Sequence, residues 1–399
     1  MSRRLFAAIL GAGALVVSAL TGGIQGADAA SPHLTHISGL HAQRVCARAT
    51  AGHAACFAKV LVNKKGAIPM ATAPLSTALS PTQLKAAYNL PATGGTGHTV
   101  AIVDAYGYPN LERDLTIYRN FYGMPTCTTA SGCLKIRDQN GLTNLPATNV
   151  GWDQEQALDV DAVSAACPGC HILVVQATSA SFTDLGTAVN TAAQSGVVAI
   201  SNSYGGGDAP DSTYGIYYSH PGIAVTASTG DNGYKGGSYP ASSSYVTAVG
   251  GTSLKMSGTT RVSETVWSGA GSGCSTYNTA IAGSSTFGTG CAKRAMADVS
   301  AAADPNTGGL SVYAPTTATA SSWSQYGGTS ESSPIIASVY ALAGGGYSNT
   351  TPYQHPSSLF DITSGSNSKR KCPQTQWCKA RVGWDGPTGL GTPNGTGAF

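Results

Sequence analysis

Short apolar segments typical of buried β-strands alternate along most of this chain with segments patterned as helices. Continuous apolar strands separated by helices predict an α/β fold with a mainly parallel sheet, flanked by helices on both faces. Such sheets carry their functional groups at the carboxyl ends of the strands. The strand patterns are residues 99–106, 171–177, 197–205, 223–231 and 245–253, and the helical patterns are residues 154–167 and 184–196.

The composition of the chain limits the classes of function that it can have. Its 399 residues are 42% hydrophobic, which is ample for a large buried core. Charged residues make up 10%, against about 25% in an average domain, and the formal net charge is +3. We therefore expect a globular monomer without a nucleic-acid or membrane-surface partner, because no basic run is long enough to attract one.

The first 30 residues have the pattern of an export signal. Arg3 and Arg4 precede an apolar stretch broken by glycines, and small residues at positions 27–30 fit a cleavage site. A membrane anchor is the alternative, but the apolar stretch is short for a bilayer span. We therefore predict that residues 1–30 are removed and that the protein is secreted.

The next segment is predicted to be a short prosegment. Residues 31–66 are mildly basic and contain their own pair of cysteines, and residues 67–79 have the composition of a linker. The expected organisation is therefore a signal peptide at 1–30, a short prosegment with its linker at 31–79, and one main domain at 80–399.

The ten cysteines fit an exported protein because they fall into local pairs that short-loop disulfides could join. The segment from Cys167 to Cys170, CPGC, could instead be a redox or zinc motif, but no second CxxC is present to complete a metal site. The expected pairs are Cys46/Cys56, Cys127/Cys133, Cys167/Cys170, Cys274/Cys291 and Cys372/Cys378.

A candidate nucleophile, Ser330, lies in YGGTSESSP (residues 326–334), directly before an apolar helical pattern. Glycines before the serine allow a sharp turn and leave room for a substrate, and a helix N-terminus favours negative charge beside Oγ. Pro334 suits the first turn of the helix. GGTS also occurs at residues 250–253, where a strand follows, so an ordinary serine stays the alternative.

The base for Ser330 is not expected to be a histidine, because none of the eight histidines lies in a His-Gly-Thr setting at the head of a helix. Glu155 and Asp159 are four residues apart on one face of a predicted helix. Like charges at this spacing cost a helix a few tenths of a kcal/mol. The pair therefore either lies on a solvated acidic face or shares a proton and serves a function.

A third carboxylate, Asp231, ends a predicted strand in the segment TGDNG. With it, residues 80–399 resemble the sedolisins, or serine-carboxyl peptidases, of the subtilisin-like superfamily. That family has an E-x-x-x-D helix, a G-D-x-G segment and a G-T-S-x-S-x-P segment in this chain order. The resemblance implies a subtilisin-like fold and a catalytic set of Glu155 as general base, Asp159 as its orienting partner, Asp231 as oxyanion donor and Ser330 as nucleophile.

The chemistry that this resemblance implies is peptide-bond hydrolysis in polypeptides at acid pH. A carboxylate base still accepts a proton at a pH where a histidine, with a pKa of about 6.5, would already be charged. Asp231 can donate a hydrogen bond to the oxyanion only when it is protonated, which favours the same pH range.

The resemblance also implies a substrate edge and a metal site. Ser203, Tyr204, Gly205 and Gly206 resemble the strand edge that pairs with the substrate backbone, and an ordinary glycine-rich turn is the alternative. Two C-terminal segments, FDITSG and RVGWDGPTGLGTPNG, resemble a loop that binds one Ca²⁺. Its ligands would be the side chains of Asp361 and Asp385 and the carbonyls of Ile362, Arg381 and Gly383.

Three departures from the family pattern bear on these expectations. The family usually has glycine where this chain has Arg381, a change that a carbonyl ligand tolerates unless the position needs a positive φ. The family's prosegment is usually a longer folded domain than residues 31–79. Asp104 lies where true subtilases carry their catalytic Asp, so an ordinary subtilase is an alternative, although the chain lacks the matching His-Gly-Thr-His helix.

A protein of another class also fits this scaffold. A catalytically inactive secreted binding protein would be favoured by the loss of a catalytic residue, and none of the four is lost.

Overall fold

The structure is a computed structural model that describes residues 1, 36–345 and 347–399. The described residues from position 36 to Phe399 form one unit. Apart from Met1, the predicted export signal lies outside the described residues. Within the described part of the chain, no helix has both the length and the apolar character needed to span a bilayer.

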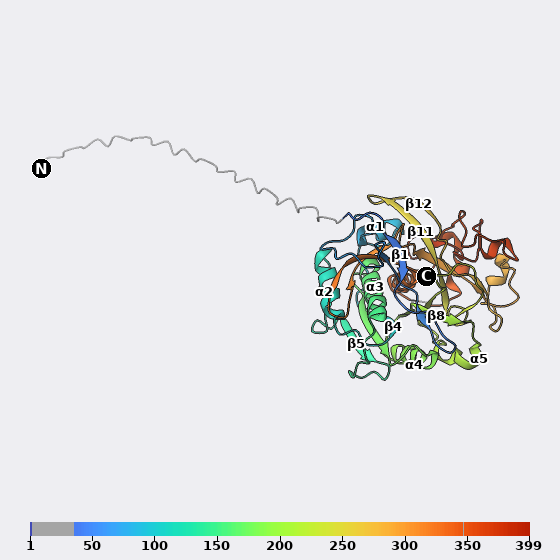
Figure 1. The fold of residues 1–399 in the computed structure, drawn as a ribbon, viewed down its shortest axis with the longest axis horizontal. Coiled ribbons are helices and arrows are strands. Elements are labelled where there is room, and N and C mark those ends of the chain that lie inside the picture. The colour runs from blue at the N-terminus through green and yellow to red at the C-terminus, as the bar shows by residue number, and fades with distance from the viewer. Residues whose placement is uncertain (2–35, 346) are drawn as a thin grey trace. The chain divides into compact units, whose positions relative to one another are not determined.

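An eight-stranded sheet forms the centre of the described unit, and all of its pairings are parallel except that of β11 with β12 (Figure 1). The strand order is β12-β11-β9-β7-β4-β6-β5, with β15 also paired to β11. Its strands are β4 (Thr99–Ala105), β5 (Leu134–Asp138), β6 (His171–Ala177), β7 (Ala199–Asn202), β9 (Ala224–Ser228), β11 (Thr247–Ser257), β12 (Thr260–Val266) and β15 (Val299–Ala302).

The helices and smaller strands surround this sheet. The α-helices are α1 (Pro81–Ala87), α2 (Leu111–Phe121), α3 (Val150–Ala166), α4 (Phe182–Ala193), α5 (Asp211–Tyr214), α6 (Thr329–Ala343) and α7 (Thr351–Gln354). The 3₁₀ turns are η1 (Gly215–Tyr217), η2 (Ser284–Phe287), η3 (Pro356–Ser358) and η4 (Thr375–Trp377). The short strands β13 (Gly273–Cys274) and β14 (Ala295–Met296) pair with each other, as do β18 (Leu359–Phe360) and β19 (Thr392–Pro393).

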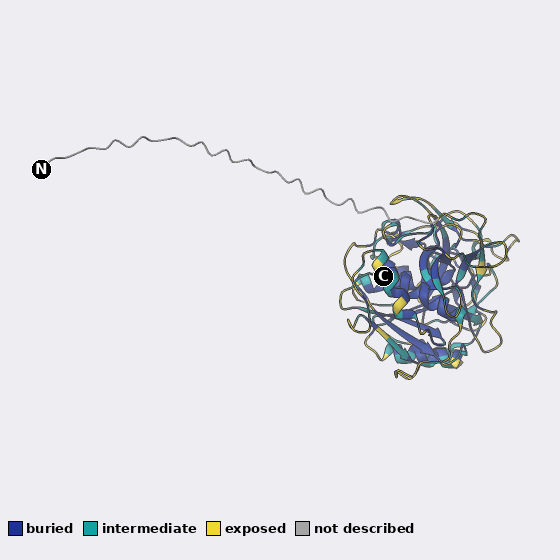
Figure 2. Ribbon diagram, turned by 60° about the vertical axis from the view of Figure 1, so that its left-hand side comes forward, coloured by how far each residue is buried: buried dark blue, intermediate teal, exposed yellow. Residues whose placement is uncertain are grey.

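Successive residues of a central strand point to opposite faces of the sheet and enter two different cores. In β4, Val100 and Ile102 join a core with α3 and α6, whereas Ala101 and Val103 join a second core with α4. These residues are fully buried, and Figure 2 shows the centre of the fold in the colour of buried residues. The prediction of a mainly parallel sheet with helices on both faces is therefore confirmed.

Helix α3, which carries the predicted carboxylate pair, is buried on nearly all sides. Its N-terminus is capped by Asn149, whose side-chain oxygen accepts hydrogen bonds from the backbone N–H of Gly151 and Trp152 at 3.1 and 3.3 Å. The helix packs against β4, α6, α2 and β16 (Leu310–Pro315). A helix enclosed in this way needs no polar stripe, so its few ionisable side chains are held away from solvent.

Helix α6 begins at Thr329, so Pro334 is the sixth helical residue and not, as predicted from the sequence, part of the first turn. A proline cannot donate to the carbonyl four residues before it, which here is that of Ser330. Ser203 Oγ lies 3.2 Å from this carbonyl oxygen and 2.8 Å from Asp159 Oδ1, and its single hydroxyl hydrogen is shared between these two acceptors. A side chain from another element thus partly replaces the missing helical hydrogen bond.

Residues 41–62, which we call the N-terminal arm, form three strands that pair with other parts of the chain. They are β1 (His41–Arg44), β2 (Ala55–Cys56) and β3 (Lys59–Val62). β3 lies between β1 and β17 (Ser321–Gly327) in a sheet of order β1-β3-β17-β16, and β2 joins β8 (Tyr204–Gly207) and β10 (Ser238–Tyr239). The arm thus packs within the same unit as the predicted main domain, and its removal from the mature protein stays a prediction.

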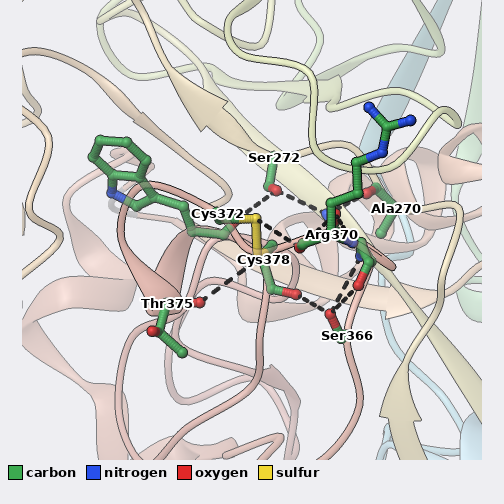
Figure 3. Close-up of a disulfide and its surroundings, with 10 residues drawn as sticks. Ala270, Ser272, Ser366, Arg370, Cys372, Thr375 and Cys378 are labelled. Carbon is green, nitrogen blue, oxygen red and sulfur yellow. Dashed lines mark hydrogen bonds between the residues drawn. A yellow bond between two sulfur atoms is a disulfide. The ribbon is translucent and has the colours of Figure 1, made fainter.

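All five predicted cysteine pairs are disulfides in the described structure, where no free cysteine remains. Figure 3 shows the pair Cys372–Cys378 beside the chain at Ala270 and Ser272. Ser366 Oγ donates to the carbonyl of Cys378 at 2.7 Å, and Asn367 donates to Ala270 O at 2.6 Å. This disulfide loop therefore supports the segment that leads from Ala270 into β13.

Candidate active site

Glu155 and Asp159 on α3 are fully buried, which excludes a solvated acidic face. Glu155 Oε2 accepts a hydrogen bond from the backbone N–H of Ala58 at 2.7 Å. Asp159 Oδ1 accepts from Ser203 Oγ at 2.8 Å. The pair thus lies inside the protein, facing groups from the N-terminal arm and from the loop that joins β7 to β8.

A third buried carboxyl group, Asp104, comes from the carboxyl end of β4. Its side chain is fully buried, and neither of its oxygens has a hydrogen-bond partner among the described residues. Burial raises the pKa of Asp159, and the charge of Asp104 raises it further. Burial likewise raises the pKa of Asp104, and the charge of Glu155 adds to that rise. The sequence singled out Asp104 only as the mark of an ordinary subtilase, whereas the structure adds it to the Glu155–Asp159 pair.

The three carboxyl groups hold their protons to a higher pH than exposed carboxyl groups do. Burial raises the pKa of Glu155 well above its ordinary value, and the neighbouring charge of Asp159 raises it further. The hydroxyl of Ser330 and the N–H of Ala58 act in the opposite direction, because they stabilise the ionised form. Protons on this cluster are therefore shared among interacting groups and do not belong to single residues.

Ser330 is the second residue of α6 and is fully buried. Its Oγ donates to the carbonyl oxygen of Ser203 at 3.1 Å. It lies close enough to Glu155 to lower the pKa of that group, although its hydrogen points to Ser203 in this conformation. A rotation of the hydroxyl would direct the proton to Glu155.

Asp231 links the start of α6 to the same site. Its Oδ1 accepts hydrogen bonds from the backbone N–H of Thr329 at 2.8 Å and from Thr329 Oγ1 at 3.0 Å. Its Oδ2 is buried and has no partner within the described ranges. Burial raises the pKa of Asp231 to about 6, while Lys59 and Thr329 limit the rise. The group can therefore keep a proton in mildly acid solution and present it on Oδ2.

The predicted substrate edge is a strand and not an isolated turn, since Tyr204 and both glycines lie in β8. The backbone of Ser203 and β8 faces the site, whereas the Tyr204 side chain is fully buried and donates to Asn202 Oδ1 at 2.8 Å. A Cβ at Gly205 or Gly206 would collide with neighbouring atoms, which explains the glycines. This edge is already paired with β2 of the arm, in the register Ala55↔Gly205 and Cys56↔Tyr204.

A cavity of about 370 Å³ opens beside these groups. Phe57, Gly205, Gly230 and Asp231 line it, together with the basic side chain of Lys235. Of the predicted catalytic residues, Asp231 therefore borders an accessible space, whereas Ser330, Glu155 and Asp159 are fully buried and do not line it.

Residues 147–375 match the model of the subtilase family. The chain belongs to the subtilase family. It is similar to kumamolisin of Bacillus sp. (strain MN-32), with 31% identity over 361 residues that cover 80% of this chain and 62% of that protein. Sedolisin of Pseudomonas sp. (strain 101) is 26% identical over 359 residues, which cover 78% of this chain and 59% of sedolisin. These similarities support the predicted membership of the sedolisin branch of the subtilisin-like superfamily.

Solved structures support the same fold. The structure of Pseudomonas sedolisin, a serine-carboxyl proteinase in complex with two molecules of pseudo-iodotyrostatin, matches with a TM-score of 0.66 at 24% sequence identity. The match covers 80% of this chain and 96% of that one. The subtilisin-like fold that the sequence predicted is thus confirmed. The chain spans only about three fifths of the length of kumamolisin and sedolisin.

The metal loop that the sedolisin resemblance predicts brings its two carboxyl groups near each other. Asp361 Oδ2 accepts from the N–H of Gly383 at 2.8 Å, and Asp385 Oδ2 accepts from the N–H of Arg381 at 3.4 Å. Burial raises the pKa of Asp385 to about 7, and the negative charge of Asp361 contributes to the rise. These two neighbouring carboxyl groups supply oxygen ligands of the kind that suits Ca²⁺.

Arg381 does not disturb this arrangement. Its guanidinium group donates to the carbonyls of Phe287 and Gly288 at 3.1 and 3.0 Å. Among the non-glycine residues that the structure describes, a positive φ occurs at Asn89 and Tyr106, so Arg381 does not need the conformation of the family's glycine.

The carboxyl groups alone do not make a complete metal site. No group of three or more Asp, Glu, His or Cys side chains is placed to hold a metal ion in the described part of the chain. The carbonyls predicted as ligands, those of Ile362, Arg381 and Gly383, would have to complete the coordination.

Proposed function

We propose that the protein is a secreted serine-carboxyl peptidase that hydrolyses peptide bonds in polypeptides at acid pH. The observation that carries this proposal is the convergence of three groups from distant segments. Ser330 lies beside Glu155, and Asp231 presents an unpaired carboxyl oxygen next to the start of the helix that carries Ser330. Secretion is supported by the five disulfides, which form in oxidising compartments.

In the proposed mechanism, Glu155 accepts the proton of Ser330 Oγ while Oγ attacks the carbonyl carbon of the substrate. The protonated Oδ2 of Asp231 donates a hydrogen bond to the oxygen that becomes negatively charged. Glu155 then gives its proton to the leaving amine. Water hydrolyses the acyl-enzyme by the same steps in reverse, and Ser330 regains its proton.

Asp159 and Asp104 act through Glu155 in this scheme. Asp159 is held by the hydroxyl of Ser203, and its charge opposes ionisation of Glu155. The charge on Asp104 is coupled to both residues. A base with a raised pKa binds the serine proton more firmly, so the cluster strengthens Glu155 as a proton acceptor.

The same scheme determines the pH range of activity. Glu155 must be ionised to accept a proton, whereas Asp231 must be protonated to donate one. Because burial raises the pKa of Asp231 to about 6, activity should fall as the pH rises through that value.

We also propose that the protein binds one Ca²⁺ in the loop that contains Asp361 and Asp385. The two side chains and the carbonyls of Ile362, Arg381 and Gly383 would hold the ion. Its role would be to neutralise the buried carboxyl group of Asp385 and to stabilise the C-terminal loop.

The experiment that tests the peptidase proposal is cleavage of acid-denatured casein at pH 4 by the purified full-length chain. We expect turnover by the wild type and none by Ser330→Ala. Ser253→Ala, the same change in the other GGTS segment, is the matched control and should retain activity. If the wild type and Ser330→Ala were equally inactive, the alternative of a binding protein without catalysis would be favoured.

A further inference from the structure

Helix α6 carries Ser330 near its start, and hydroxyl groups anchor most residues of the first turn to neighbouring segments. The anchoring hydrogen bonds join Thr329 to Asp231 at 3.0 Å, Ser330 to Ser203 at 3.1 Å, Ser332 to Ala302 at 2.9 Å and Ser333 to Ser201 at 2.9 Å. Glu331 is the exception. Its side chain is fully buried, but neither of its carboxyl oxygens has a hydrogen-bond partner among the described residues.

The carboxyl group of Glu331 is separate from the proposed catalytic cluster. Burial raises its pKa well above the ordinary value. The backbone N–H of Leu310, at the start of β16, opposes this rise without making a hydrogen bond, and the negative charge of Asp304 adds to the rise. Glu331 is therefore a buried acid, next to the nucleophile in sequence, that the proposed mechanism does not use.

Within the described structure, the elements around α6 offer no positive charge to balance an ionised Glu331. The helix packs chiefly against α3, β4, β7, β9, β11, β15 and β17. The buried titratable side chains on these elements are carboxylic acids and Tyr326, and their one basic residue, Lys255 on β11, is exposed. Asp304, which acts on Glu331, accepts a hydrogen bond from Ser253 Oγ at 2.7 Å.

Helix α2 also faces this region without supplying a counter-charge. Its Tyr118 is fully buried, and burial raises the pKa of that hydroxyl, with further contributions from the charges of Asp161 and Glu331. The basic residue next to it, Arg119, directs its guanidinium group elsewhere. It donates to Pro125 O, Ser164 Oγ and Pro168 O at 2.8, 2.9 and 2.8 Å.

A carboxylate that is buried without a hydrogen bond or a cation is strongly unfavourable, so Glu331 is neutral while the turn is closed. The helix N-terminus favours a negative charge in its first turn, but this effect is small compared with the cost of burial. The turn begins at the cap made by Asp231, which borders the accessible cavity. Opening of the turn would therefore let water reach Glu331 and allow it to ionise.

We propose that Glu331 is a positioning residue whose carboxyl group lets the first turn of α6 stay closed only while it is protonated. Its ionisation would open the turn and move Ser330 away from Glu155. The consequence for catalysis rests on the proposed peptidase function, whereas the opening of the turn does not.

The test is amide hydrogen exchange, read by mass spectrometry, in peptides that cover residues 327–336 of full-length Ser330→Ala. An opened glutamate ionises near its ordinary pKa of about 4.3, so between pH 5 and pH 7 the opening constant should rise by about tenfold per pH unit. The constant is obtained after correction for the intrinsic exchange rate. This rise should be absent from Ser330→Ala/Glu331→Gln. Ionisation of Asp231 affects both proteins alike, so the difference between them isolates Glu331.

Two further variants make the comparison specific. Glu112→Gln removes a carboxyl group of α2 that accepts from Thr129 Oγ1 at 2.9 Å in a solvent-exposed hydrogen bond. In the Ser330→Ala background, it should leave the pH dependence of the opening constant as it was. Glu331→Met is uncharged and similar in size to glutamate, so it should abolish the rise as Gln does, and it replaces Gln if that variant does not fold.

The catalytic readout is the pH profile of kcat on casein. Asp231→Asn removes the titration of the oxyanion donor, so adding Glu331→Gln to it should move the alkaline limb of kcat further upward. Glu112→Gln added to Asp231→Asn should not move that limb. A side chain that only filled space would change stability at every pH and leave the limb in place.

The outcomes separate this inference from the proposed function. An opening constant that rises equally with pH in Ser330→Ala and in both of its Glu331 variants would overturn the role of Glu331, whether or not the wild type digests casein. A wild type that does not digest casein, in a chain whose opening constant depends on Glu331 as expected, would contradict the peptidase proposal and leave the control of the turn by Glu331 standing.

Discussion

The tetrapeptide Gly-Gly-Thr-Ser occurs twice in this chain with two different structures. Residues 250–253 lie within β11, where Ser253 donates to Asp304 Oδ2 at 2.7 Å. Residues 327–330 end β17 and begin α6, where Ser330 is fully buried beside Glu155. One serine thus belongs to a partly exposed hydrogen bond, and the other is the proposed nucleophile.

The difference between the two copies comes from their partners in the fold. In the first copy, Thr252 is paired with β12 and β15 on its two sides, which keeps the chain extended. In the second copy, Gly328 has a φ of +105°, and Asp231 accepts the N–H of Thr329. A distant carboxyl group therefore turns the same residues into the start of a helix, as expected when tertiary contacts override local preference.

The largest expected difference between the copies is catalytic. Ser330→Ala should lower kcat by a factor on the scale of about 10⁶, the value known for removal of the nucleophile from subtilisin. Ser253→Ala should leave kcat unchanged and cost about 1 kcal/mol of stability through its lost hydrogen bond. Initial rates of casein cleavage at pH 4 check both expectations. Equal losses in the two variants would show that the second copy has no special role.

Asp231, which distinguishes the second copy, should have the next largest effect. Asp231→Ala removes the proposed oxyanion donor, and the loss of one such donor costs about 10²–10³ in rate. Asp231→Asn keeps a donor at every pH, so the decline of kcat/KM above a pH of about 6 should move upward. The acid limb, set by the Glu155 cluster, should stay in place. If neither variant moves the alkaline limb, Asp231 only caps the helix.

The same residue should make folding stability depend on pH. Since the pKa of Asp231 rises to about 6 in the folded state, the folded protein retains a proton that the unfolded chain releases near pH 4. The free energy of unfolding should therefore decrease by about 2 kcal/mol, from this group alone, as the pH rises from 4 to 6.

Urea unfolding of Ser330→Ala, with and without Asp231→Asn, measures this contribution in a protein that lacks the proposed nucleophile. The slope against pH should be smaller in the double variant. Identical slopes would show that Asp231 does not hold its proton in the folded state.

The smallest expected effect is a change in melting temperature on removal of Ca²⁺. It concerns the first copy because that copy packs against the C-terminal loop that contains the proposed Ca²⁺ ligands. A Cβ at Gly250 would collide with the carbonyl of Pro387, two residues beyond Asp385. Removal of Ca²⁺ should lower the melting temperature, because an ion at a hundred times its Kd stabilises the folded state by about 2.7 kcal/mol. Asp385→Asn should melt at the lower temperature with or without the ion. A melting curve that chelation does not change, with calcium absent by elemental analysis, would remove the proposed site.

Features that depend on short stretches of sequence were predictable. The apolar strands indicated a parallel sheet, and cysteines close in sequence formed the expected disulfides. The carboxylate pair was visible because residues four apart share one face of a helix. The motifs around Asp231 and Ser330 marked residues that the fold then brings together.

Features that depend on contacts between distant segments were not predictable. Asp104 reads as the end of a strand, and only the packing of α3 over β4 brings it to Glu155. The start of α6 was misjudged because its cap comes from Asp231, far away in the sequence. β2 contains only two residues, so no periodic pattern could indicate that the arm would pair with β8.

The pairing of β2 with β8 makes the arm a competitor for any peptide that binds along this sheet edge. Ala55 and Cys56 already occupy the backbone positions beside Gly205 and Tyr204 that an added strand would need. A peptide could pair there only after this two-residue strand detaches, so the ease of its detachment would set access to the edge.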